Sequence, residues 1–108
     1  MLAKKIVNYP TEHYSCKATI NGYHFIKLEI SQYYQTKPGR STVSDNRIRE
    51  LVKQLNNKEF TRDNEYYSFE PLYIGYRAYN LVWDFDEIQS SNTLIIIDCY
   101  RERKYDKK

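Results

Sequence analysis

A chain of 108 residues is large enough for one hydrophobic core but not for two, so the sequence predicts a single domain. We expect a soluble protein, because 29% of the residues are charged and the mean hydropathy is −0.82, and the 16% of aromatic residues argue against disorder. The sequence shows no signal peptide and no apolar run of transmembrane length, so we expect a cytoplasmic protein without a membrane partner. The net charge of +3 equals that of residues 101–108 alone, where five residues are basic and two acidic, and such a concentrated charge suggests a binding partner.

The N-terminal part of the chain predicts an arm followed by a β-hairpin. Residues 1–12 show no clear hydrophobic period, so we expect an arm there, with at most a short strand at 5–8. From His13 to Ile30 apolar and polar residues alternate, and the pair Asn21-Gly22 interrupts the alternation. Both of these residues tolerate the positive φ of a type I′ turn, which favours a hairpin.

A helix over residues 23–35 is the competing interpretation, because Ile26, Ile30, Tyr33 and Tyr34 also fit a period of 3.6. We prefer the hairpin, in which every second residue from His24 to Ile30 shares one face.

A loop over residues 36–44 precedes the strongest helix signal in the sequence. Ser44 is the predicted N-cap, and Asp45 favours the positive end of the helix dipole. We expect the helix to end at Asn56-Asn57 and a polar loop to follow over 58–65. The apolar residues of this helix recur at i, i+3, i+4 and i+7 and predict a stripe that packs on the sheet: Ile48, Leu51, Val52 and Leu55.

Three strands are predicted after the helix. The first is short, at 66–69, and the second is long, over 73–85, with Arg77 and Tyr79 on one face. A loop over 84–92 leads into the third, whose run 94–97 is apolar on both faces, as in a strand covered on both sides. The order predicts an α+β fold: a curved antiparallel sheet, made of the N-terminal hairpin and a C-terminal three-stranded meander, packed by one main helix.

The sequence offers few of the usual signatures of a metal or catalytic site. Gly-rich phosphate loops, zinc-ligand spacing and a Ser–His–Asp arrangement are absent, so we expect no metal and no cofactor. Cys16 and Cys99 are interpreted as two buried thiols in a reducing cytoplasm, with a single disulfide as the alternative. The carboxylates Asp84, Asp86 and Glu87 are interpreted as solvated loop residues rather than as a cation site.

The remaining candidate site is cationic and aromatic. If the last strand extends past Tyr100, then Arg101, Arg103 and Tyr105 lie on one face, and Arg77 lies on the neighbouring strand. Guanidinium groups suit phosphate oxygens, and tyrosine can stack on a base or donate its hydroxyl. The alternative is that the tail 101–108 is solvated and disordered.

These residues also carry a resemblance to a known family. The segment GYR at 75–77, a hairpin with Asp86-Glu87, an apolar strand that ends in RER at 101–103, and the nearby Tyr105 resemble the C-terminal half of the RelE/ParE toxin superfamily. The preceding helix, entered through GRSTVSDNRIRELVKQLNN, is similar to the second helix of that family, so the resemblance covers about residues 39–105. It implies a barnase-like or RelE-like fold and a metal-independent ribonuclease.

The resemblance implies roles for individual residues. Arg77 and Arg101 match the arginines that hold the scissile phosphate, and Tyr105 stands near the catalytic tyrosine of the family. Arg103 is a further cation, and His24 is the acid or base candidate by its intrinsic pKa, with a core histidine as the alternative. The expected RNA contacts are Tyr79, Tyr100, Lys104 and Lys107.

The leading hypothesis is therefore a metal-independent endoribonuclease toxin of a toxin–antitoxin or toxin–immunity system. Its expected partners are RNA, including ribosome-bound mRNA, and an acidic antitoxin or immunity protein that covers the basic tail. The alternative is a non-catalytic RNA- or protein-binding module of the ParE-like branch. An immunity or structural protein would fit an acidic surface better than this basic one.

Overall fold

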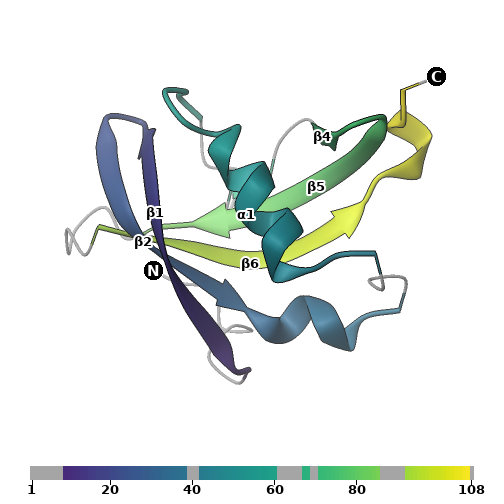
Figure 1. Ribbon diagram of the computed structural model, residues 1–108, viewed down its shortest axis with the longest axis horizontal. Helices are drawn as coiled ribbons and strands as arrows, with labels where there is room; N and C mark the ends of the chain where they lie inside the picture. Colours follow the sequence, from purple (N-terminus) through teal and green to yellow (C-terminus); the bar gives the residue numbers. More distant parts are fainter. Residues whose placement is uncertain (1–8, 39–41, 61–66, 69–70, 86–91, 108) are drawn as a thin grey trace.

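The computed structural model describes residues 9–38, 42–60, 67–68, 71–85 and 92–107. These residues form one α-helix packed on a curled, six-stranded mixed sheet of strand order β1-β2-β6-β5-β3, in which β4 also pairs with β5 (Figure 1). The α+β class is confirmed. The strands are β1 (Thr11–Ile20), β2 (Tyr23–Ser31), β3 (Tyr67–Ser68), β4 (Leu72–Ile74), β5 (Arg77–Asp84) and β6 (Thr93–Arg101), and the helix is α1 (Asp45–Lys53), with short 3₁₀ turns η2 (Gln32–Thr36) and η3 (Arg103–Tyr105).

The N-terminal hairpin is confirmed. Asn21 and Gly22 both have positive φ, 53° and 80°, and Ile20 pairs with Tyr23 across the turn. The competing helix over 23–35 is wrong for its first nine residues, which form β2. Because β1 already begins at Thr11, the predicted arm over 1–12 is two residues too long, and its possible strand at 5–8 lies outside the described residues.

The predicted alternation along β2 does not hold throughout. Phe25 is buried, whereas Ile26, which the alternation assigned to the core, is 54% exposed. A bulge explains the difference, because Ser15 pairs with Lys27 but Ala18 pairs with Phe25, so two residues of β1 oppose one residue of β2. The backbone N–H groups of Ile26 and Lys27 accordingly both donate to the Asn92 carbonyl, at 3.0 and 3.1 Å.

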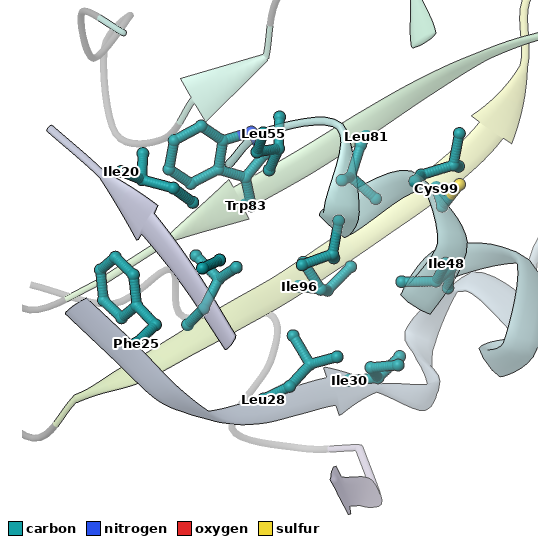
Figure 2. Close-up of a cluster of buried hydrophobic side chains, with 14 of the residues drawn as sticks. Ile20, Phe25, Leu28, Ile30, Ile48, Leu55, Leu81, Trp83, Ile96 and Cys99 are labelled. Carbon is teal, nitrogen blue, oxygen red and sulfur yellow. The ribbon is translucent and has the colours of Figure 1, made fainter. Parts of the chain in front are cut away.

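Helix α1 follows the predicted capping and packing. The Ser44 hydroxyl accepts the Arg47 N–H at 3.2 Å, and the stripe residues are all buried against the sheet. Figure 2 shows Ile48 and Leu55 directed towards the side chains of the strands. The helix ends at Lys53, earlier than predicted, and a turn leads to Asn57, whose φ of 62° redirects the chain towards β1.

The N-terminus of α1 is fastened to the sheet by a shared carboxylate. The hydroxyls of Tyr14 in β1 and Tyr34 in η2 donate to Asp45, at 2.7 and 2.6 Å. The Gln32 amide also donates to this carboxylate, at 3.3 Å. Burial, and then the hydrogen bond to Asp45, raise the pKa of Tyr34 to about 12.

The strand pairing differs from the predicted hairpin plus meander in two ways. First, β2 and β6 are parallel, with Leu28 opposite Leu94 and Ile30 opposite Ile96, so the sheet is mixed rather than antiparallel. Second, the predicted long strand 73–85 is a hairpin of β4 and β5, whose turn at Gly75 has a φ of 62°. A glycine in a tyrosine-rich strand pattern marked this reversal of direction.

The pairing of β5 with β6 and with the short β3 is confirmed, and so is the burial of β6 on both faces. Leu94, Ile96 and Cys99 belong to the main core, and Ile95 and Ile97 pack with Val82 on the other face. Cys99 is buried and Cys16 half-buried, and the two are not joined by a disulfide. Burial raises the pKa of Cys16.

The hydrogen bond from Tyr34 to Asp45 predicts a specific loss of stability in alkali. A raised pKa means that the folded protein holds the phenol proton more tightly than the unfolded chain does. The stabilisation is therefore complete below pH 10 and is lost as the pH rises from 10 towards 12. Urea unfolding at pH 9 and pH 11 should show a larger fall for the wild type than for Tyr34→Phe.

The exposed Tyr23 provides the control, since Tyr23→Phe should lose as much stability between the two pH values as the wild type does. Equal losses in the wild type and Tyr34→Phe would contradict the coupling to Asp45.

Candidate functional site

The C-terminal segment after β6 is folded against the β4–β5 hairpin. The Glu102 N–H donates to the Ala78 carbonyl at 2.9 Å, and the Lys107 N–H donates to the Tyr76 carbonyl at 2.8 Å. The Tyr105 carbonyl accepts the Tyr73 hydroxyl at 3.1 Å. The alternative of a disordered tail is therefore wrong for residues 102–107, which curl back beside β5 (Figure 1, yellow).

The strand itself stops at Arg101, and η3 follows. The expectation that Arg101, Arg103 and Tyr105 alternate along one extended strand is accordingly wrong. In a 3₁₀ turn the side chains point in different directions, and those of Arg103, Lys104 and Tyr105 are all exposed.

Arg101 is buried in an ion pair. Its Nη2 contacts Asp106 Oδ2, its Nε donates to the Ala78 carbonyl at 3.3 Å, and its side chain is 7% exposed. Asp106 Oδ1 accepts the Ala78 N–H at 2.7 Å. The charge of Arg101 is therefore neutralised by Asp106, a residue of the same C-terminal tail that the sequence predicts to form the site with it.

Three arginines surround the fully buried Tyr79. The Arg101 guanidinium lies 5.4 Å from the ring centroid, and Arg47 Nη1 donates to the hydroxyl at 3.0 Å. Hydrogen bonds to Tyr76 and then to Tyr79 raise the pKa of Arg77. Because Tyr79 is enclosed, it cannot stack on a base, so its predicted role in RNA contact is wrong.

Arg47 was not among the residues predicted for this site from the sequence. Its position four residues before Leu51 puts it at the border of the apolar stripe, and that spacing is the signal that pointed towards the sheet. It also donates to the Thr42 carbonyl at 2.7 Å, which holds its side chain across the start of the helix.

Tyr76, which was not among the residues predicted for this site, is exposed and pairs with the half-buried Arg77. Arg77 Nε lies 3.4 Å from the Tyr76 hydroxyl, and its guanidinium carbon lies 5.6 Å from the ring centroid. Tyr76 is 57% exposed, and the hydrogen bond and positive charge of Arg77 lower its pKa. In a continuous strand these neighbours would face opposite ways, and the turn at Gly75 brings them together.

Basic and aromatic side chains continue around this pair. Lys107 Nζ lies 4.4 Å from the Tyr73 ring centroid, and Lys104 Nζ lies 5.2 Å from that of Tyr105. Within the part of the chain that the structure describes, no carboxylate forms an ion pair with the basic members. We name this set the C-terminal surface: Tyr73, Tyr76, Arg77, Arg103, Lys104, Tyr105 and Lys107.

Two predicted site residues lie elsewhere. Tyr100 is on the opposite face of β6, where it packs on the small cluster of Ile95, Ile97 and Val82, and its hydroxyl accepts the Asn80 amide at 3.1 Å. It therefore does not share a surface with the tail residues.

His24 is exposed on the N-terminal hairpin, so the core-histidine alternative is wrong. Its Nδ1 lies 2.8 Å from the Thr19 hydroxyl. The pairing of Lys27 with Thr93 places His24 beyond the start of β6, whereas Arg101 ends that strand. At about 3.3 Å per residue the two side chains are separated by roughly 25 Å or more, so His24 does not serve this site.

The carboxylates predicted in the loop after β5 are described only in part. Asp84, expected in a solvated loop, is buried, and its Oδ1 accepts the Phe85 N–H at 2.8 Å, while Asp86 and Glu87 lie outside the described residues. Over the described ranges, no group of three or more His, Cys, Asp or Glu residues is arranged to hold a metal ion. No helix in those ranges has the length and apolar character to cross a membrane.

Comparison of the chain with protein-family models, with curated proteins and with solved structures found no match. The resemblance to the RelE/ParE superfamily therefore stays a prediction that rests on its motifs.

The two arginines of the RER motif should differ sharply in their effect on stability. Arg101→Ala leaves the partly buried Asp106 carboxylate without its partner, and the free energy of unfolding should fall by about 3 kcal/mol. Arg103→Ala removes an exposed side chain, and the change should stay within about 0.5 kcal/mol.

Urea unfolding of both variants at neutral pH provides the measurement. Equal stabilities would show that the ion pair does not fasten the tail.

Proposed function

We propose that the protein binds single-stranded RNA through the C-terminal surface. The observation that carries this proposal is the exposure of Tyr76 and Tyr105, each beside a basic side chain, on a surface whose cations have no carboxylate partner among the described residues. Tyr105 is 49% exposed, so both rings can accept a stacked base.

The tyrosine rings and the basic side chains would bind different parts of the RNA. Bases that are not paired in a duplex stack on tyrosine rings, which favours a single strand over a helix. Lys104 lies beside Tyr105, and Lys107 lies beside Tyr73. Together with the exposed Arg103 they would contact phosphates, and this part of the binding should weaken with salt. Arg77 adds a guanidinium that can bind a phosphate with two hydrogen bonds.

The choice of RNA over other anions is supported by the resemblance of residues 39–105 to the RelE/ParE superfamily. Binding alone corresponds to the non-catalytic alternative, and it requires only the exposed rings and cations. A cytoplasmic location suits this function and is in keeping with the lack of a disulfide between Cys16 and Cys99.

Binding of a fluorescent single-stranded RNA, measured by anisotropy at several salt concentrations, tests the proposal. We expect affinity that falls as salt rises, and a loss of about tenfold or more for Tyr76→Ala, because stacking contributes ~1–3 kcal/mol per base. Lys104→Ala should weaken the affinity and reduce its salt dependence.

Matched substitutions on other surfaces serve as controls. Lys53 is exposed on α1 and Tyr23 is exposed on the N-terminal hairpin, so Lys53→Ala and Tyr23→Ala should retain wild-type affinity. Equal losses in these controls, or no RNA binding by the wild type, would exclude the C-terminal surface as an RNA-binding site.

A second candidate function is metal-independent cleavage of the bound RNA, as in an endoribonuclease toxin. The pair of Tyr76 and Arg77 favours it, since the arginine lowers the pKa of an exposed phenol beside a phosphate-binding surface. The phenolate would take the proton of a 2′-hydroxyl while that oxygen bonds to phosphorus and the P–O5′ bond breaks. Tyr105 offers a proton for the leaving 5′-oxygen, and Arg77 stabilises the charge on phosphorus.

This candidate predicts cleavage in the presence of EDTA, with products that carry a 2′,3′-cyclic phosphate and a 5′-hydroxyl. The rate should rise with pH as Tyr76 loses its proton, and this rise should begin below the ordinary phenol pKa of 10. Tyr76→Phe should abolish cleavage and retain RNA binding, because the ring remains.

Cleavage that is unchanged in Tyr76→Phe would exclude the tyrosine as the base. Arg101→Ala is a poor test of catalysis, because loss of the buried ion pair with Asp106 would reduce activity through stability alone.

If the protein cleaves RNA, ribosome-bound mRNA included, its producing cell requires a means of silencing it. We propose an acidic antitoxin or immunity protein that covers the C-terminal surface, whose cations have no carboxylate partner among the described residues. Such a partner would compete with RNA for the same side chains.

A further inference from the structure

We propose that Arg101 and the Ala78 N–H form a second anion-binding site, closed by Asp106, which opens to an RNA phosphate when residues 102–107 detach from β5. This inference rests on the proposed RNA-binding function and identifies an additional phosphate position. It would also explain why the charged side chain of Arg101 is buried at the end of β6.

The donors at this position are arranged as in a phosphate site. The Ala78 N–H donates to one oxygen of Asp106 at 2.7 Å, and Arg101 contacts the other oxygen. The guanidinium is held in place by its bond to the Ala78 carbonyl, at 3.3 Å, and by the Tyr79 ring. A backbone N–H and a fixed guanidinium are donors that phosphoryl oxygens accept as readily as a carboxylate does.

The charge around the site favours an incoming anion once the carboxylate leaves. Arg47 reaches the Tyr79 hydroxyl from α1, and Arg77 lies two residues before Tyr79 on β5. Neither arginine has an ion-pair partner among the described residues. Departure of Asp106 would therefore leave three guanidinium groups around one tyrosine. A phosphate that occupies the vacated position would compensate this charge.

The tail that carries Asp106 is held by polar contacts. Its turn η3 buries no residue. Among the described residues, its attachments to the β4–β5 hairpin are hydrogen bonds of Glu102, Lys107, the Tyr105 carbonyl and the Asp106 carboxylate, together with the ion pair. Segments with few buried apolar contacts open at a small fraction of the cost of global unfolding. Release of the tail is thus compatible with an intact core.

Phosphate binding by full-length variants tests the site. Titration of inorganic phosphate, followed by calorimetry at low salt, should give Asp106→Asn at least tenfold tighter binding than the wild type. Glu102→Gln removes a neighbouring carboxylate that does not contact Arg101 and serves as the charge-matched control, with wild-type affinity. The double variant Arg101→Gln/Asp106→Asn should lose the gain.

Equal phosphate affinity in Asp106→Asn and Glu102→Gln would overturn the proposal and leave the ion pair as a structural contact. If Asp106→Asn does not fold, hydrogen exchange in the wild type supplies the test. Saturating single-stranded RNA should accelerate exchange of the Lys107 amide, because its hydrogen bond to the Tyr76 carbonyl is lost when the tail detaches, and unchanged exchange would overturn the proposal.

The two proposals fail in different ways. Tight phosphate binding by Asp106→Asn without RNA binding by any variant would support the anion site and refute the RNA function. RNA binding by the wild type, with neither a phosphate gain nor faster Lys107 exchange, would do the opposite.

Discussion

The structure depends on the position of β6, which is paired along both edges. Its parallel pairing with β2 joins the N-terminal hairpin to the sheet, and its antiparallel pairing with β5 joins the C-terminal half. Both faces of the strand are also buried, with Leu94 and Ile96 in the main core and Ile95 and Ile97 opposite. Because the strand is fixed in this way, its last residue, Arg101, has a defined position at the C-terminal end of this central strand.

That fixed end explains how a charged C-terminus becomes part of a surface. After Arg101 the chain turns through η3, and Asp106 returns to the Ala78 N–H and to the same arginine. The charge of the tail is thereby divided into two parts. Arg101 is enclosed and compensated, whereas Lys104 and Lys107 stay exposed beside tyrosine rings.

Local features of the fold could be predicted because they depend on neighbours in sequence. Asn21-Gly22 satisfies the φ demands of a tight turn, and Ser44 caps a helix whose apolar period needs no tertiary information. The parallel pairing of β2 with β6 could not be predicted, because no local sequence signal specifies which strand pairs with a buried strand. The bulge opposite Ile26 was hidden for the same reason, since alternation continues in sequence while the pairing shifts.

The candidate site was predicted in part. The proximity of Arg77 and Arg101 around Tyr79 follows from their neighbouring strands, as expected. The position of Tyr76 beside Arg77 depends on the reversal at Gly75, which was not predicted. The burial of Arg101 depends on Asp106, which entered the sequence prediction only as one acidic residue in a basic tail.

A titration of the isotope-labelled protein with a short single-stranded RNA, followed through backbone amide signals, tests the account most directly. It predicts shifts concentrated at residues 73–78 and 102–107, whereas shifts centred on the N-terminal hairpin, or none at saturating RNA, would contradict it.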